Sequence, residues 1–454
     1  MSSLRHRLSG DGRVIVRLGL PLLANNLSVV GMQFADTVMA GQLGARDLAG
    51  LAVGVSYYHL HMFVGLGMFM AVSPIIAHAY GANDVGRVAR YVRQTLWLVI
   101  ALAVLLVCGL LQARWVLPAL NISPEILPIA IGYVAAMSWG MPGLLAFFAL
   151  RFFSEGLGRT RPIMYIGLAA LALNVLGNWV FIYGRWGMPR LGAVGCGVAT
   201  AIADTSMFVA MFIHVLRHRA YGPFHVFSRL EWPDVSVLRE LIRLGTPIAG
   251  SVLAEGGLFV VAALMMGAMG AVQTGAHQIA LNYAAFMFMV PLAVSSATTI
   301  HVGHLLGRGD VQGGRAAGLL GIGMCAAIMA VSAGTILLLN EHIAALYTQD
   351  AQVRTLAAGL LLLAALFQVS DGLQVGAAGA LRGFKDTAVP MLICIFGYWF
   401  VGFPLAYVLG VRQAGGPAYV WVGLTVGLTV CAVLLIARYL RVTRHRLQSA
   451  AAVA

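Results

Sequence analysis

Long apolar stretches follow one another along the whole chain of 454 residues. A helix needs roughly 20 apolar residues to cross the hydrocarbon core of a bilayer, and twelve stretches approach or exceed that length. Because 60% of the residues are hydrophobic and only 10% are charged, a soluble globular fold is excluded. The sequence therefore predicts an all-α polytopic membrane protein with transmembrane helices over residues 15–40, 52–79, 95–113, 127–150, 163–183, 192–215, 241–267, 276–301, 317–339, 353–381, 388–410 and 418–438.

The formal net charge of +13 suggests either a nucleic-acid surface or a signal for membrane orientation. The basic residues are dispersed over short loops, and no basic domain is visible, which argues against nucleic acid as a partner. With the N-terminus placed in the cytoplasm, few of the 29 Lys and Arg residues fall in outer loops, namely Arg46, Arg114, Arg185, Arg190, Arg354 and Arg412. This bias follows the positive-inside rule and predicts that both termini lie in the cytoplasm. Arg is used almost to the exclusion of Lys, which suggests a bacterial genome, so we expect a bacterial inner-membrane protein.

Patterns of catalysis and of metal binding are absent from the sequence. The five cysteines lie in apolar stretches without a CxxC pair, so neither a disulfide framework nor a zinc site is indicated. No HExxH, P-loop or GxSxG motif occurs. We therefore expect no enzyme activity and no cofactor other than a coupling ion. The basic N-terminal segment lacks a small-residue cleavage site and is expected to lead into a retained first helix.

The chain repeats itself after 226 residues. Residues 17–85 lie over residues 243–311 without a gap, and the match includes Gly, Pro, Tyr, His and Asp as well as apolar residues. Six spans separate the copies, an even number, so both halves insert in the same direction. Transporters built from such parallel repeats hold their substrate between two bundles. The sequence predicts two six-helix bundles, 1–216 and 241–454, joined by a cytoplasmic linker, 217–240, with a central cavity.

Two carboxylates lie inside the second half of the membrane domain. Glu255 is near the middle of the seventh apolar stretch, and Asp371 is in the tenth. A charge at the bilayer centre costs on the order of 3 kcal/mol on insertion scales, so both side chains should face a protein interior or a wet cavity. Their predicted depths differ by only ~6 Å, close enough for one shared site.

Two buried carboxylates without a basic partner either share a proton or ligate a cation. We therefore predict a coupling-ion site for H⁺ or Na⁺ at Glu255 and Asp371. The alternative is a protonated pair that only ties helices together.

A third carboxylate, Asp36, lies in the first span. In the repeat, Asp36 is equivalent to Ala262, and Glu255 is equivalent to Val29. Groups that only hold helices together would more naturally recur at matching positions, so this asymmetry favours binding of an ion or substrate at Asp36. The halves are thus expected to share a scaffold and to differ in chemistry.

Polar residues spaced i, i+4 share one face of a helix, and three such pairs occur within the predicted spans. Two of the pairs can form a second ion or substrate site with Asp36, and the third is expected to line the cavity beside Glu255. Tying helices together is the alternative role for these side chains. The pairs are Asn174 with Asn178 in the fifth span, Thr200 with Asp204 in the sixth, and Gln278 with Asn282 in the eighth.

Several segments together resemble the multidrug and toxic compound extrusion (MATE) transporters, in their NorM-type bacterial branch. They are GMQFADTVMAGQLGARDLAG, YGANDVGRVAR, GLGRTRP, the Asn174/Asn178 pair, AEGGLFVVAALMMGAMGAVQTGAHQIALN and VSDGLQVGAAGALRGFKDTAVP. The resemblance covers essentially the whole chain. It implies a V-shaped pair of six-helix bundles that export organic cations in exchange for Na⁺ or H⁺.

The resemblance also implies roles for particular residues. Glu255 and Asp371 match the cation pair of the second bundle, and Asp36 with Asn174, Asn178 and Thr200 matches the site of the first. In some relatives the Asn178 position is acidic, whereas here it is neutral.

Two other transporter types stay open at this point. A flippase of lipid-linked precursors would share the fold but would need a basic central cavity, whereas the intramembrane charges here are acidic. A major-facilitator transporter would need a GxxxDRxGRR-like loop after the second span, which YGANDVGRVAR only half fits. The expected partners are organic cations and the lipid bilayer, without nucleic acid, and we expect a monomer.

Overall fold

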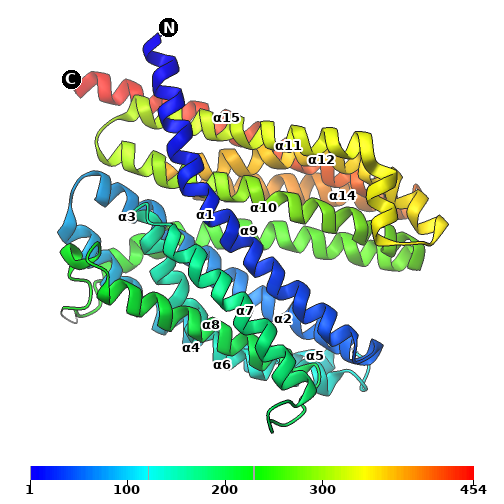
Figure 1. Cartoon of the computed structure of the whole chain (residues 1–454). Coiled ribbons are helices and arrows are strands. Elements are labelled where there is room, and N and C mark those ends of the chain that lie inside the picture. Colours follow the sequence, from blue (N-terminus) through cyan, green and yellow to red (C-terminus); the bar gives the residue numbers. More distant parts are fainter. Residues whose placement is uncertain (1, 121, 229–230, 454) are drawn as a thin grey trace. The chain divides into compact units, whose positions relative to one another are not determined.

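The computed structural model describes residues 2–120, 122–228 and 231–453, and within these ranges it contains helices and no strand. Twelve helical segments of the described chain are long and apolar enough to cross a membrane, as predicted. The elements are α1 (Ser2–Gly41), α2 (Ala45–Met70), α3 (Val72–Gly81), α4 (Val85–Leu111), α5 (Ala113–Ala119), α6 (Leu127–Gly156), α7 (Arg161–Tyr183), α8 (Val194–Arg217), η1 (Gly222–Phe224), α9 (Val235–Met269), α10 (Ala271–Gly307), α11 (Val311–Tyr347), α12 (Ala351–Gly383), α13 (Ala388–Ile395), η2 (Phe396–Gly402), α14 (Phe403–Leu405), η3 (Ala406–Arg412) and α15 (Pro417–Val453) (Figure 1).

Several helices extend well beyond the apolar stretches that predicted them. The third span begins at Val85, not at residue 95, because the Asp84 side chain caps the helix by accepting from the Arg87 amide at 2.9 Å. The charged turns that follow the cap continue the same helix. Hydropathy marks the part of a helix that lies in lipid, whereas capping residues mark where the helix begins.

The chain divides into two compact units. The N-unit comprises residues 24–249, and the C-unit comprises residues 1–23 with 250–454. Helices α1 and α9 therefore contribute residues to both units. Pro21 and Pro247, which are 226 residues apart, stand just before the two junctions. The bundle boundaries taken from the sequence repeat, 1–216 and 241–454, stay a prediction.

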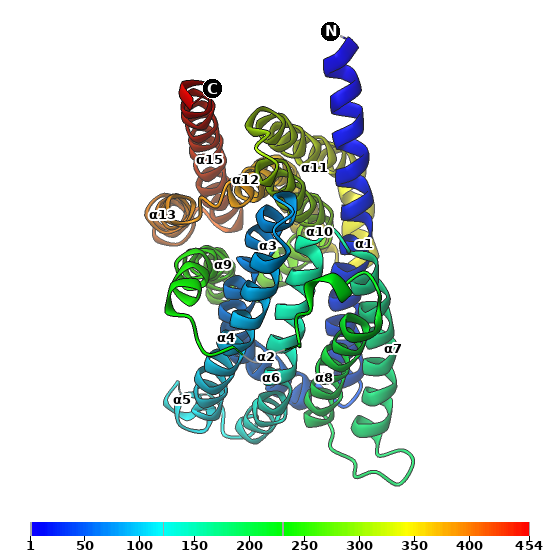
Figure 2. The same ribbon diagram turned by 90° about the vertical axis from the view of Figure 1, so that its left-hand side faces the viewer.

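One helix is central to the packing of each unit. In the N-unit, α6 packs against α2, α4 and α8 (Figure 2). In the C-unit, α12 packs against α10, α11 and α15 (Figure 1). These two helices are the fourth spans of the two repeats. Close approach of α6 to α8 requires a glycine, since a Cβ atom on Gly140 would lie 2.6 Å from the Cα of Ala201.

The repeat is visible in how equivalent helices begin. Gly44 and Gly270 precede α2 and α10 with φ of 125° and 130°, a backbone conformation that favours glycine. Asp84 and Asp310 cap α4 and α11, and each accepts from the backbone amide three residues later, at 2.9 and 2.7 Å. Each pair is separated by 226 residues, so the parallel repeat predicted from the sequence extends to the capping geometry.

The eleventh span departs from a regular α-helix. π-helical turns form η2 and η3, with the short α14 between them. Such turns are rare and occur often at functional sites. In this stretch Tyr398 is fully buried, and the Trp399 indole nitrogen donates to the carbonyl oxygen of Ala254 in α9 at 3.1 Å. The span is thereby fixed against α9 beside Glu255.

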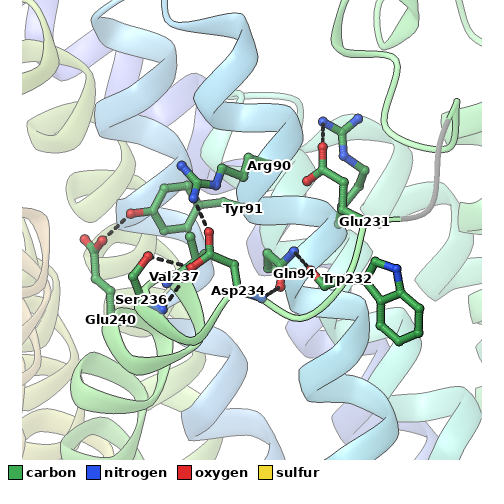
Figure 3. Close-up of polar contacts among 10 residues, drawn as sticks. Arg90, Tyr91, Gln94, Glu231, Trp232, Asp234, Ser236, Val237 and Glu240 are labelled. Carbon is green, nitrogen blue, oxygen red and sulfur yellow. Dashed lines mark hydrogen bonds and ion pairs between the residues drawn. The ribbon is translucent and has the colours of Figure 1, made fainter.

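The segment that precedes α9 is fastened to α4 within the N-unit (Figure 3). The Gln94 side chain donates to the Trp232 carbonyl at 2.9 Å and accepts from the Asp234 amide at 2.8 Å. Arg90 pairs with Asp234, and Arg93 pairs with Glu231 at 2.9 Å. The part of the predicted linker that the structure describes is thus an ordered strap along the charged turns of α4.

Candidate functional site

Asp36 of α1 is the centre of a hydrogen-bond network in the N-unit. Its Oδ1 accepts from the Asn178 amide at 2.6 Å and from the Asn174 amide at 3.3 Å. Its Oδ2 accepts from the Thr200 hydroxyl at 3.1 Å. These four side chains come from α1, α7 and α8, and the i, i+4 spacing places both amides on the face of α7 that meets Asp36. Neutral donors stabilise a carboxylate without neutralising its charge.

A cavity of about 390 Å³ lies beside Asp36, and all its lining residues belong to the N-unit. Its volume lies within the range of small-molecule pockets in proteins. The wall is largely apolar and includes Met62, Met137, Phe147 and Phe148. Asp36 itself is 7% exposed, so a ligand there would contact its carboxylate within an apolar surround.

Asp204 lines the same cavity, where its charge interacts with that of Asp36. Thr200, one turn earlier on α8, also lines it. Sequence reasoning missed Tyr58, Tyr133 and Arg151, which reach the cavity from α2 and α6. Arg151 is bound to Glu155 at 2.7 Å, so its charge is already compensated. Tyrosines in apolar helices look like packing residues, and only the fold shows that they face a cavity.

Glu255 of α9 and Asp371 of α12 lie close enough in the C-unit for their charges to interact. Asp371 is only 4% exposed. The charge of Arg382, in the last turn of α12, also acts on Glu255. The sequence alone does not show this interaction, because it depends on how α12 packs against its neighbours.

Three buried oxygen atoms without hydrogen-bond partners belong to Asp371 and to residues near it. Among the described residues, Asp371 Oδ1, Gln374 Oε1 and the Tyr398 hydroxyl are buried and have no partner. Tyr398 interacts electrostatically with both Glu255 and Asp371, and Gln374 follows Asp371 by one helical turn. Unpartnered buried polar atoms in native proteins usually bind water or an ion. This donor set suits a hard cation, which prefers oxygen ligands.

The third predicted pair, Gln278 and Asn282, is exposed on α10, and its place beside Glu255 stays a prediction. Asn174 and Asn178, by contrast, are completely buried beside Asp36. The two halves thus differ in chemistry: the N-unit holds a carboxylate with neutral donors beside a cavity, and the C-unit holds the buried Asp371 with the partly exposed Glu255.

Comparison with known families agrees with this architecture. The sequence profile of the family described as MatE matches residues 21–180 and again residues 247–408. The two matches begin at positions that are equivalent in the sequence repeat, and together they cover most of the chain. This chain belongs to the MATE family. The resemblance noted in the sequence is thereby confirmed.

Individual MATE relatives cover nearly the full length. The chain is 39% identical over 446 residues to the "Probable multidrug resistance protein NorM" of Xanthomonas campestris pv. campestris, covering 98% of this chain and 97% of that protein. It is also 39% identical to the "Multidrug resistance protein MdtK" of Yersinia pseudotuberculosis, covering 94% and 95%.

Solved MATE structures share the fold at low sequence identity. A structure described as the outward-facing conformation of a multidrug resistance MATE transporter aligns with a TM-score of 0.89 at 20% identity, covering 96% of this chain and 97% of that one. The eukaryotic MATE transporter AtDTX14 aligns with a TM-score of 0.87 at 17% identity, covering 98% and 100%. The all-helical fold with twelve spans is therefore that of MATE transporters.

Proposed function

We propose that this MATE protein exports amphipathic organic cations in exchange for Na⁺ or H⁺ by alternating access. The observation that carries the proposal is the division of the intramembrane carboxylates between two sites of different chemistry. Asp36 faces an apolar cavity large enough for a small organic molecule. Glu255 and Asp371 lie among unpartnered buried oxygen atoms. The names of the relatives, both multidrug resistance proteins, support the same substrate class.

In the proposed mechanism, the substrate cation binds at Asp36. The donors Asn174, Asn178 and Thr200 keep the carboxylate oriented and stabilise its charge, while aromatic and methionine side chains contact the apolar part of the ligand. Methionine is flexible and polarizable, which suits a site that accepts varied shapes.

The coupling ion binds at Glu255 and Asp371. A proton would be shared between the carboxylates, and Na⁺ would be bound by their oxygens with Gln374 and Tyr398. A membrane potential of about 100 mV supplies about 2.3 kcal/mol per net charge moved, and a one-for-one exchange of two monovalent cations moves no net charge. Inward movement of the ion down its concentration gradient then supplies the energy for outward movement of the drug.

The same proposal includes the cellular setting. The loop charges favour a bacterial inner membrane with both termini in the cytoplasm. We propose that the monomer is the working unit and that no cofactor takes part beyond the coupling ion. The cavity carries Asp36 and Asp204 against a single, paired arginine, which argues against an anionic lipid-linked precursor as the cargo.

Everted vesicles containing the protein test the proposal with a fluorescent organic cation and an imposed Na⁺ or H⁺ gradient. Each of Glu255→Gln and Asp371→Asn should reduce gradient-driven transport to the level of empty vesicles, because each removes a charge that the ion must neutralise. Glu341→Gln, at an exposed position of α11, is the matched control and should transport normally. Transport that survives both substitutions would refute the assignment of the ion site.

A further inference from the structure

A histidine lies inside the membrane region of the C-unit without a hydrogen-bond partner. His277 of α10 is completely buried, and neither of its ring nitrogens has a partner among the described residues. The Trp421 ring of α15 stands edge-on to it at 5.8 Å between centroids, and the Trp421 indole N–H is also unpartnered. Leaving such groups unpaired is unfavourable, and the usual partners of buried polar groups without a protein partner are ordered waters.

This pair of rings lies one helical turn from the carboxylate site. Phe367 of α12 contacts Trp421 at 5.6 Å between centroids. Phe367 and Asp371 are spaced i, i+4, which puts them on one face of α12 about 6 Å apart along the axis. His277 and Trp421 both lie in the second turn of their helices. The two rings therefore lie between Asp371 and the end of the C-unit at which α10 and α15 begin.

A further polar atom flanks the same turn of α12. Gln368 is completely buried, its Oε1 accepts from the Ser332 hydroxyl at 2.5 Å, and its Nε2 has no partner among the described residues. Gln368 precedes Asp371 by one turn. Along the axis of α12, the unpartnered donors of Trp421 and Gln368 thus precede the unpartnered acceptor Oδ1 of Asp371. Waters between them would point their hydrogens toward Asp371.

We propose that His277, with the Trp421 and Gln368 donors, holds a short file of water that carries protons from the outer end of the C-unit to Asp371. This step rests on the proposed exchange transport and selects the proton as the coupling ion. A proton arriving from outside binds one ring nitrogen of His277 and gives the imidazolium ion. The other ring nitrogen then releases its proton through water to Asp371, which becomes a neutral carboxylic acid. The ring returns to neutral imidazole.

The division of roles follows from the chemistry of the groups. An indole N–H and an amide NH₂ only donate, so Trp421 and Gln368 can orient water but cannot pass a proton on. Histidine has both a donor and an acceptor nitrogen, and it is the residue suited to relay protons near neutral pH. The other titratable and charged groups of this interior are Glu255 from α9, Cys325 from α11, Asp371 and Arg382 from α12, Cys394 from α13, Tyr398 from η2 and Cys431 from α15.

The test uses the full-length chain reconstituted in proteoliposomes with a pH-sensitive dye and a fluorescent cation, over a range of outside pH. His277→Phe keeps an aromatic ring against Trp421 but removes both nitrogens. Proton uptake coupled to export should fall by about a hundredfold or more, the size of a typical general acid–base contribution, and its pH dependence should flatten. Trp421→Phe should have a smaller effect. His342→Phe, an exposed histidine of α11, should match the wild type.

A second variant separates loss of proton transfer from misfolding of the protein. His277→Gln keeps polar atoms that can bind water but cannot carry a proton, so it should bind the fluorescent cation normally and still lose coupled proton uptake. Wild-type rates and pH profiles in both His277 variants would overturn the inference. So would wild-type export that runs on a Na⁺ gradient without proton uptake, a result that leaves the proposed exchange intact. Export that no ion gradient drives would overturn both.

Discussion

At the scale of single residues, Asp36 shows how neutral hydrogen-bond donors can stabilise an ionised carboxylate that is to bind a cation. Three neutral side chains donate to its two oxygens, and the shortest of these bonds comes from Asn178. A hydrogen bond to a charged group contributes about 1.5–3 kcal/mol. The residues around Asp36 therefore determine how readily its carboxylate stays ionised beside the cavity.

A graded loss of binding is expected when the donors are removed one at a time. Asn178→Leu removes the 2.6 Å bond and should weaken binding of an organic cation by about tenfold or more. Thr200→Val removes the longer 3.1 Å bond and should have a smaller effect. Fluorescence titration of the purified variants measures both. A larger loss for Thr200→Val than for Asn178→Leu would contradict this account of the site.

A pH-dependent contribution to stability is expected at Asp234, which lies outside the spans. The Ser236 hydroxyl and then Arg90 lower the pKa of this carboxyl from its ordinary value of 3.8 to about 2. A lowered pKa in the folded state means that its stabilisation is present above pH 3.8 and is lost as the pH falls toward 2. Asp234→Asn should therefore lower the melting temperature in detergent at pH 7. The difference from wild type should shrink between pH 4 and pH 2, and an unchanged difference at pH 2 would contradict the assignment.

At the scale of helices, contact between α6 and α8 depends on the absence of a side chain at Gly140. A Cβ atom there would meet the backbone of Ala201 at 2.6 Å, whereas one on Gly323 of α11 would meet nothing within 4 Å. Overpacking costs about 1–3 kcal/mol, while alanine is about 1 kcal/mol more favourable than glycine in a helix. Gly140→Ala should thus lower the melting temperature, and Gly323→Ala should leave it unchanged or raise it. Equal effects would show that the close approach is unimportant.

Much of the helical arrangement was predictable from the sequence, because segments that cross lipid must be long and apolar. The number of spans and the repeat follow from hydropathy and from an ungapped match. The helix ends were not predictable from hydropathy, since α4 continues through its arginines to the Asp84 cap. The π-helical turns of the eleventh span were also missed, because the stretch around Tyr398 reads as an ordinary apolar helix.

The candidate sites were predictable where polar residues stand out against an apolar background. Asp36, with its amide pair and Thr200, was expected as one group, and the structure shows the hydrogen bonds among them. The aromatic residues His277 and Trp421 carry no such signal, since either reads as packing. The influence of Arg382 on Glu255 depends on how α12 and α9 pack in the folded C-unit. No local sequence pattern predicts that packing.

At the scale of the whole molecule, the parallel repeat predicts which loops share a side of the membrane. Ala82 and Arg308 are equivalent exposed positions after the second and eighth spans, and Gln413 follows the eleventh. In a background without native cysteines, Ala82→Cys and Arg308→Cys should react with an impermeant thiol reagent from the cytoplasmic side. Gln413→Cys should react from the opposite side. Labelling of the first two from opposite sides would exclude parallel halves.

The pairing of Glu255 with Asp371 has an electrical consequence. On the proposed division of roles, the two carboxylates together take up one proton or one Na⁺ while Asp36 releases one singly charged drug. Such a turnover moves no net charge, so export of a monovalent cation would register no current and would continue when the voltage is short-circuited. Export of a doubly charged drug would instead carry one net positive charge outward and would be opposed by an inside-negative voltage, by about 2.3 kcal/mol per 100 mV.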